Sequence, residues 1–280
     1  MCSITLAIAS VLLCLHKACI GLMQKTVNVS AHDISMSPLP RPFLILLPGT
    51  LCDERIFAAL KRRLRSTVTM RALSYSGMKE PQSWLKRLLA ELPPKFYIAG
   101  FSLGGLLALE LLRLAGDRVL GIALIASNAQ AASQKSRRKS AMLRRMWLDR
   151  GPSEVAKHVK PAYFHHEAKR REHERLVFDM ALRTSKRSAM QEFAWAAERP
   201  SGLKTLLAYP GKVLAVSGAQ DRLCPPAWQR AMQEAQPRMV WREIARCGHF
   251  VPLEAPTQLS SAMSDWIFDQ KQPLAVLESA

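Results

Sequence analysis

Short strand-like runs alternate with helix-forming stretches along the first half of this chain, and this alternation restricts the fold more than any other feature. Most of the runs are almost wholly apolar, which is typical of strands buried on both faces of a parallel sheet. Right-handed crossovers between such strands place helices on both faces of the sheet. The expected strands are residues 43–47, 67–73, 96–99 and 119–126, and the expected helices are residues 54–64, 81–92 and 106–115.

The alternation is interrupted after residue 128. Residues 129–200 contain no convincing strand but several stretches with apolar residues at helical spacing, which indicates an inserted helical cap. Strands then return at 212–218 and 239–244, with helices at 226–235 and 256–268. We therefore expect a core made of residues 36–128 and 201–270, a helical cap of residues 129–200, and a frayed tail of residues 271–280.

Residues 1–35 form a separate N-terminal segment. Residues 4–15 are nearly all apolar, like the centre of a secretory signal, but no Lys or Arg precedes them and His16 and Lys17 interrupt the run. The run is also short for a membrane span. Two alternatives stay open. Translation starts downstream, for instance at Met36, and the protein is cytoplasmic, or residues 1–23 are a signal or anchor and the protein is exported or membrane-associated.

Ser102 lies between an expected strand and an expected helix, within the sequence Gly100-Phe101-Ser102-Leu103-Gly104-Gly105. A serine on such a tight strand-to-helix turn has a strained backbone, and side chains two residues before and after it would collide with the turn. Gly100 and Gly104 supply that clearance. The pattern predicts a serine nucleophile, and the alternative is a serine that merely caps a helix.

A serine nucleophile needs a base, and the base needs an acid that orients it, because the hydroxyl alone stays protonated at neutral pH. Asp221 follows the expected strand 212–218, and His249 follows the expected strand 239–244. The carboxyl ends of parallel strands meet at one edge of a sheet, so both side chains are expected near Ser102. The other position for the acid, residues 127–130, holds no carboxylate.

Four motifs stand in the order and strand context of one known fold. They are Leu47-Pro48-Gly49-Thr50, Gly100-Phe101-Ser102-Leu103-Gly104-Gly105, Gly218-Ala219-Gln220-Asp221 and Gly248-His249-Phe250-Val251-Pro252-Leu253-Glu254. Through these motifs the chain resembles the α/β-hydrolases, over about residues 42–268. The resemblance implies an α/β fold with a mostly parallel central sheet, helices on both faces and a helical cap inserted after the sixth strand. The family usually opens with a strand pair, to which only residues 24–30 could contribute here.

The resemblance implies Ser102 as the nucleophile, His249 as general base and then acid, and Asp221 as the residue that orients the imidazole and stabilises its cation. The implied reaction is hydrolysis of a carboxylic ester or thioester through an acyl-enzyme. Within the family the chain is similar to small esterases with a helical cap, including those that cleave methyl esters of carrier-bound acyl chains. The alternatives are acyl transfer or elimination by the same triad, and a non-catalytic basic binding module.

The same resemblance implies an oxyanion hole built from two backbone N–H groups, those of Thr50 and Leu103. Pro48 stands where many relatives have a histidine, so the resemblance allows the first of these donors to be Thr50 or the residue after it. Leu51 is therefore the neighbouring alternative to Thr50.

The balance of 40 Lys and Arg against 22 Asp and Glu gives a net charge of +18, which favours contact with anionic partners. Residues 129–200 hold 17 of the basic and 8 of the acidic residues. Such charge is usually a solvated face, and the functional alternative is a surface that docks an anionic substrate or carrier. The expected partner is a small-molecule ester or acyl substrate, free or on an acidic carrier. No nucleic acid and no stable membrane insertion are expected, and the oligomeric state stays open.

Apolar side chains of the expected cap and of the loops beside it could line an acyl pocket, or could simply hold the cap together. They are Leu51, Trp147, Phe164, Phe178, Trp195 and Phe250. We expect no cofactor and no metal, because neither the cysteines nor the histidines fall in a metal-ligand spacing. Cys52, Cys224 and Cys247 are expected to be free thiols, and His158, His165, His166 and His173 to be surface residues.

Overall fold

The computed structural model describes residues 41–159, 163–165 and 170–269. The N-terminal segment 1–35, the Met36 start, the sheet contribution of residues 24–30 and the tail at 271–280 therefore lie outside the described residues. None of the described helices combines the length and the apolar character needed to cross a membrane.

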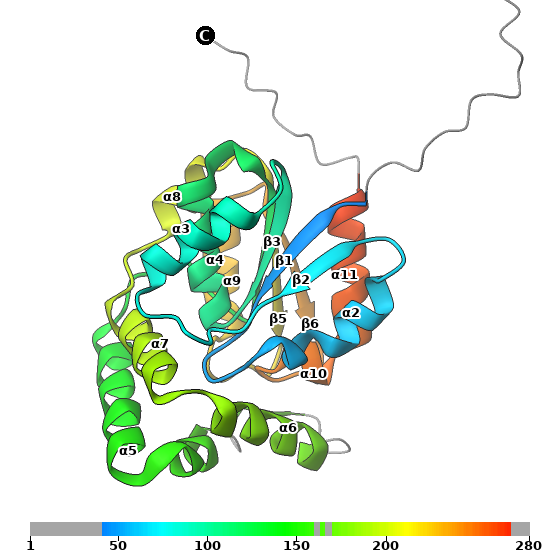
Figure 1. The fold of residues 1–280 in the computed structure, drawn as a ribbon. Coiled ribbons are helices and arrows are strands. Elements are labelled where there is room, and N and C mark those ends of the chain that lie inside the picture. Colours follow the sequence, from blue (N-terminus) through cyan, green and yellow to red (C-terminus); the bar gives the residue numbers. More distant parts are fainter. Residues whose placement is uncertain (1–40, 160–162, 166–169, 270–280) are drawn as a thin grey trace, which may run out of the picture. The chain divides into compact units, whose positions relative to one another are not determined.

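In the part of the chain that the structure describes, six parallel strands form one sheet in the order β2-β1-β3-β4-β5-β6 (Figure 1). The chain enters at β1, moves outward to β2, and returns past β1 to β3 before it continues toward β6. The strand order therefore changes direction at the neighbouring strands β1 and β3. In open parallel sheets, ligands bind beside the carboxyl ends of the strands at such a point. The strands are β1 (Phe43–Leu47), β2 (Thr69–Ala72), β3 (Phe96–Phe101), β4 (Val119–Ile125), β5 (Lys212–Gly218) and β6 (Val240–Ile244).

Helices cover both faces of the sheet, which confirms the expected fold class (Figure 1). Successive side chains of a strand point to opposite faces, so Leu44 and Leu46 of β1 join one buried cluster and Ile45 and Leu47 join the other. The first cluster is closed by α2 (Ala58–Leu64) and α11 (Pro256–Phe268). The second is closed by α3 (Pro81–Glu91), α4 (Leu103–Ala115), α8 (Leu203–Ala208) and α9 (Pro226–Ala235).

Among the described residues, three helices lie between β4 and α8 and form a helical insertion, which occupies the position of the expected cap at residues 129–200. They are α5 (Gln134–Val159), α6 (Arg170–Arg183) and α7 (Lys186–Glu198). α5 is broken at Gly151, whose φ of 82° and ψ of 177° are not helical. The two segments that connect the insertion to the core are hydrogen-bonded to each other. The amide of Ala132 donates to the carbonyl of Arg199, and the amide of Gly202 donates to the carbonyl of Ala129.

The structure differs from the sequence prediction mainly in short elements. The expected helix 54–64 begins as a 3-10 turn, η1 (Glu54–Phe57), capped by the Asp53 carboxylate, before α2 starts. η2 (Gly116–Arg118), α8 and α10 (Val251–Glu254) were not expected. They have three to six residues, which is too few for an apolar period of 3.6 to show in the sequence.

Candidate active site

Ser102 lies on a strained turn between β3 and α4, with φ at 52° and ψ at −115°. Such a conformation costs a non-glycine residue about 1–3 kcal/mol and persists only when its surroundings hold it. Here the Ser102 amide donates to the Ile125 carbonyl at 2.8 Å, and the Ser127 hydroxyl donates to the Ser102 carbonyl at 2.7 Å. The turn therefore presents the Ser102 hydroxyl at the carboxyl edge of the sheet.

The glycines of this turn are required by close backbone contacts. A Cβ at Gly100 would lie 2.2 Å from the carbonyl oxygen of Gly104, and a Cβ at Gly104 would lie 2.0 Å from that of Leu47. Real Cβ atoms do not approach backbone this closely. The steric reason for a glycine two residues before and after Ser102 thus holds in the folded chain.

The structure brings Ser102, His249 and Asp221 into one line of hydrogen bonds. His249 Nε2 lies 3.0 Å from Ser102 Oγ, and His249 Nδ1 lies 2.8 Å from Asp221 Oδ2. Both His249 and Asp221 are buried. With the Nδ1 proton directed at the carboxylate, Nε2 is left as the acceptor that faces the serine hydroxyl.

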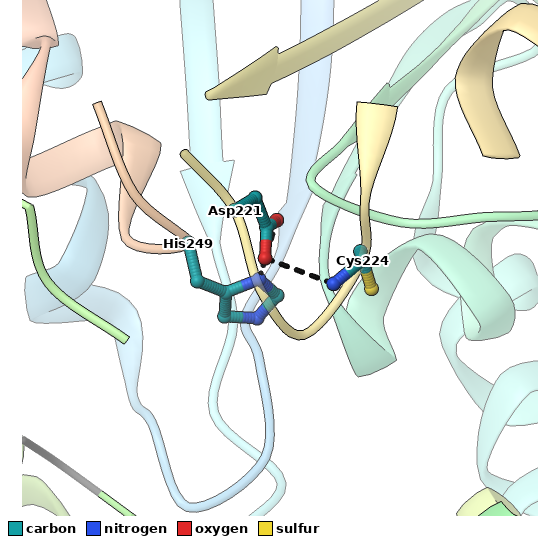
Figure 2. Close-up of side chains that lie close together, drawn as sticks. All are labelled: Asp221, Cys224 and His249. Atoms are coloured by element: carbon teal, nitrogen blue, oxygen red, sulfur yellow. Dashed lines mark hydrogen bonds and ion pairs between the residues drawn. The ribbon is translucent and has the colours of Figure 1, made fainter. Parts of the chain in front are cut away.

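Asp221 is held by its own loop. Its Oδ1 accepts the amides of Leu223 and Cys224 at 2.8 Å each, while Oδ2 faces His249. Figure 2 shows the carboxylate between the imidazole and the Cys224 amide. Both oxygens are therefore committed to hydrogen bonds, which fixes the orientation of the carboxylate beside His249.

Within the described residues, Asp221, Cys224 and His249 form a group whose metal-ligand atoms lie within 4.8 Å of one another (Figure 2). Metal binding by such a group would need a thiolate and a free carboxylate oxygen. Burial raises the pKa of the Cys224 thiol well above its usual value. Both carboxylate oxygens of Asp221 are already engaged in hydrogen bonds. The donor set thus fits a hydrogen-bonded Asp–His pair better than a metal centre. Cys52, Cys224 and Cys247 are buried, and no disulfide joins them within the described residues.

The loop that carries His249 is organised around the Glu254 carboxylate. Glu254 Oε2 accepts the amides of Gly248 at 2.9 Å and His165 at 2.7 Å, and Oε1 accepts the amide of Phe250 at 3.0 Å. The His249 amide itself donates to the Tyr163 carbonyl at 2.7 Å. The backbone on either side of His249 is therefore fixed by one acidic side chain, whose role was not apparent from the sequence.

We expect Glu254→Ala to lower the free energy of unfolding by about 2–3 kcal/mol, because three amide donors lose their acceptor. Urea unfolding measures this change. Glu234→Ala, an exposed carboxylate on α9, is the matched control and should stay within about 0.5 kcal/mol of the wild type. Equal effects of the two substitutions would contradict the role assigned to Glu254.

The loop 48–52 follows β1 and holds the two alternative donors predicted for the oxyanion hole. The Leu51 amide donates to Glu192 Oε2 of α7 at 2.6 Å, so this N–H is already engaged. The Thr50 amide has no hydrogen-bond partner within the described ranges. The Leu103 amide lies in the first turn of α4, where helical N–H groups point outward and favour negative charge. This arrangement favours Thr50 over Leu51 as the donor from the loop.

Glu192 is only 1% exposed, and its burial raises the pKa of the carboxyl to about 8. In the unfolded chain the group ionises near its ordinary value of 4.5. Between these two values the folded protein holds a proton that the unfolded chain has lost, so the free energy of unfolding falls as pH rises from about 4.5 to 8. Above about 8 both states are ionised and this contribution is constant.

Glu192→Gln should remove this contribution to the pH dependence. We expect the free energy of unfolding of Glu192→Gln, relative to that of the wild type, to increase from pH 5 to pH 8 and then to level off. Urea unfolding at each pH measures the difference. A difference that stays constant from pH 5 to pH 9 would show that Glu192 does not titrate with a raised pKa.

The residues predicted to line an acyl pocket fall in three places. Phe164 and Phe250 stack on each other at a centroid distance of 4.5 Å, beside His249. Leu51, Trp147 and Phe178 belong to the apolar interior of the helical insertion. Trp195 packs against the cluster around α4 and lines a cavity of about 330 Å³ that no member of the Ser102–His249–Asp221 line borders.

The histidine predictions hold in part. His158 and His165 are exposed, as expected, and His166 lies outside the described residues. The prediction for His173 was wrong, because it is buried and stacks on Phe164 at 6.0 Å. Its position on α6 faces the core rather than solvent, which the charged residues around it in the sequence conceal.

Comparison with known proteins gives a family and a fold. A family model described as the alpha/beta hydrolase family matches residues 44–262. No curated protein matches the chain. Among similar solved structures is a thermophilic esterase from Thermogutta terrifontis with bound malate, at 21% identity and a TM-score of 0.73, covering 81% of this chain and 89% of that one.

Two further structures show how widely the fold is used. An enol-lactonase from Burkholderia xenovorans LB400 has 19% identity and a TM-score of 0.72, over 81% of this chain and 91% of its own. A bromoperoxidase from Bacillus anthracis has 14% identity and a TM-score of 0.69, over 81% and 92%. Identities this low establish a shared fold, and function must be argued from the site.

Proposed function

Because the chain belongs to the α/β-hydrolase family, we propose that it is a serine hydrolase that cleaves a carboxylic ester or thioester through an acyl-enzyme. The observation that carries this proposal is the unbroken line of hydrogen bonds from Asp221 through His249 to Ser102. The similarity to an esterase and an enol-lactonase agrees with it.

In the proposed reaction, His249 Nε2 takes the Ser102 proton while Oγ forms a bond to the acyl carbon. The bond from that carbon to the alcohol or thiol then breaks, and the proton on Nε2 passes to the leaving group. A water molecule next gives a proton to Nε2 and attacks the same carbon. The bond from the acyl carbon to Ser102 Oγ then breaks, the proton on Nε2 passes to Oγ, and the acid leaves. Asp221 holds the imidazole tautomer and stabilises its cation throughout.

The negative charge that develops on the acyl oxygen would be bound by the amides of Thr50 and Leu103. Both lie at the carboxyl edge of the sheet, one after β1 and one at the start of α4. Amide donors of this kind each contribute about 10²–10³ in rate, because they are aimed at the charge before the reaction begins.

A fluorophosphonate probe and a series of p-nitrophenyl esters from acetate to decanoate test this proposal. The wild type should be labelled and should release p-nitrophenol, whereas Ser102→Ala should do neither. Labelling without hydrolysis at any chain length would favour acyl transfer or elimination by the same residues. A wild type that is not labelled would contradict an activated serine.

We further propose that the helical insertion docks an acyl group carried on an acidic partner. Lys135, Arg138 and Arg144 of α5 are exposed, whereas Lys139 donates to the Tyr163 hydroxyl at 2.5 Å and is better left unchanged in a test. Replacing the three exposed cations with alanine should raise the KM for a carrier-bound ester about tenfold and weaken its salt dependence.

The matched control is a triple alanine variant of Arg87, Lys204 and Arg238, three exposed cations outside the helical insertion. It removes the same charge from other surfaces. A small uncharged ester should give the same KM with the wild type and both variants. If both triple variants change the KM for the carrier-bound ester equally, the net charge of the protein determines that KM. Such a result would contradict docking on the surface of α5.

A further inference from the structure

The contact between Glu192 and the loop 48–52 joins the helical insertion to the proposed oxyanion hole. Glu192 lies on α7, 141 positions along the chain from Leu51, yet its Oε2 accepts the Leu51 amide at 2.6 Å inside the protein. Burying a carboxylic acid costs free energy unless the group is hydrogen-bonded or paired. Glu192 makes no ion pair within the described residues, and the amide of Leu51 is its hydrogen-bond donor.

The side chain of Leu51 is held by the same insertion. It is 3% exposed and packs with Trp147 and Phe193 in the apolar cluster formed by α5, α6 and α7. Both the amide and the side chain of this one residue are therefore fixed by helices that come from another part of the sequence.

The backbone at Leu51 needs such support. The loop turns between Gly49 and Cys52, where the Cys52 amide donates to the Gly49 carbonyl at 3.1 Å. Leu51 occupies the third position of this turn with φ at 54°, a conformation normally taken by glycine. The Gly49 carbonyl belongs to the same peptide plane as the Thr50 amide, so the geometry of this turn sets the direction of that N–H group.

Two further hydrogen bonds connect the same loop to α7 through Tyr75. The Tyr75 hydroxyl donates to the Pro48 carbonyl at 2.6 Å, and the Ser188 hydroxyl of α7 donates to the Tyr75 carbonyl at 2.8 Å. Tyr75 is buried, and its pKa lies well above the ordinary value because of that burial. It therefore stays protonated and remains a donor.

We propose that Glu192 is a positioning residue: through the Leu51 amide it holds the loop 48–52 in the strained turn that aims the Thr50 N–H, so that docking of the helical insertion completes the oxyanion hole. This inference rests on the proposed function for its effect on rate. Its structural part, the support of the strained turn, does not depend on the reaction.

Three variants test the proposal. Glu192→Leu removes the acceptor at similar volume, and Glu192→Gln keeps an amide oxygen that can accept the Leu51 N–H. Asp179→Leu is the matched control, because Asp179 of α6 also joins the insertion to the core, through Arg55 at 2.5 Å, but does not contact the loop 48–52. The measurements are kcat and KM for p-nitrophenyl butyrate, and amide hydrogen exchange of a peptide covering residues 49–57.

We expect Glu192→Leu to lower kcat about 10- to 100-fold with KM within about twofold, since only the charged transition state depends on the aimed N–H. Glu192→Gln and Asp179→Leu should stay within about threefold of the wild type. Exchange at the amides of residues 49–52 within this peptide should rise at least about tenfold in Glu192→Leu alone, because Asp179→Leu acts on the peptide through Arg55. An unchanged kcat, or a fall that Asp179→Leu shares, would overturn the catalytic part.

The exchange measurement separates this inference from the proposed function. If the wild type neither turns over esters nor reacts with the fluorophosphonate, the proposed function fails, and the exchange result alone decides whether Glu192 supports the turn. Equal exchange in the wild type and Glu192→Leu would overturn the inference even in an active hydrolase.

Discussion

Ser102→Ala is expected to lower kcat/KM for p-nitrophenyl esters by about 10⁶-fold, the order of loss found when a serine nucleophile is removed. The substitution deletes the atom that forms the acyl-enzyme bond in the proposed reaction and leaves His249 with no hydroxyl at 3.0 Å. Residual rate would come from the oxyanion donors and from substrate binding. Steady-state kinetics of the purified variant measure the effect.

The same substitution should change stability little, because an alanine keeps the Cβ atom and the backbone bonds of the turn. The Ser102 amide still donates to Ile125, and Ser127 still donates to the Ser102 carbonyl. We expect the free energy of unfolding to stay within about 1 kcal/mol of the wild type. A folded Ser102→Ala variant that keeps a tenth or more of the activity would contradict the proposed nucleophile.

Gly104→Ala is expected to be the most destabilising small substitution in the core. In an open helix the change from glycine to alanine stabilises by about 0.5–1 kcal/mol. At Gly104 the new Cβ would lie 2.0 Å from the Leu47 carbonyl oxygen and 2.5 Å from the Pro48 oxygen, both backbone atoms. We therefore expect Gly104→Ala to destabilise the protein, lowering the free energy of unfolding by about 3 kcal/mol or more, at the upper end of overpacking costs. Urea unfolding measures this loss.

Gly77→Ala supplies the comparison for Gly104. Gly77 has φ at 73° but nothing within 4 Å of an added Cβ, so its substitution costs only the conformational term of about 1–2 kcal/mol. If Gly104→Ala were no more destabilising than Gly77→Ala, then α4 could shift away from β1 at little cost. The tight approach of α4 to β1 would not then be the reason for a glycine.

Ser102, Asp221 and His249 could be selected from the sequence because each has a local signature. Ser102 stands between glycines after a strand, and the other two follow the expected strands 212–218 and 239–244. Parallel strands bring their carboxyl ends to one edge, so the topology rule placed the three together without knowledge of any distance. The folded chain then joins them at 2.8 and 3.0 Å.

Glu192 and Glu254 have no such signature. Glu254 acts through three backbone amides, and Glu192 acts through one amide 141 positions away. Every residue except proline carries a backbone N–H donor, so the sequence does not show which residues donate to a carboxylate. A glutamate on an amphipathic helix is usually solvated, and nothing in the sequence around Glu192 distinguishes it from such a residue.

The parallel sheet with helices on both faces, the helical insertion after residue 128, and the serine, histidine and aspartate at one edge could all be predicted from the sequence. These features follow from the local apolar period, the turn glycines and the chain order. The folded chain was needed to show that Glu192 engages the Leu51 amide, that Trp195 lines a cavity away from His249, and that His173 is buried. The physical reason is that burial and long-range hydrogen bonding depend on how the insertion packs on the sheet, and no local pattern encodes that packing.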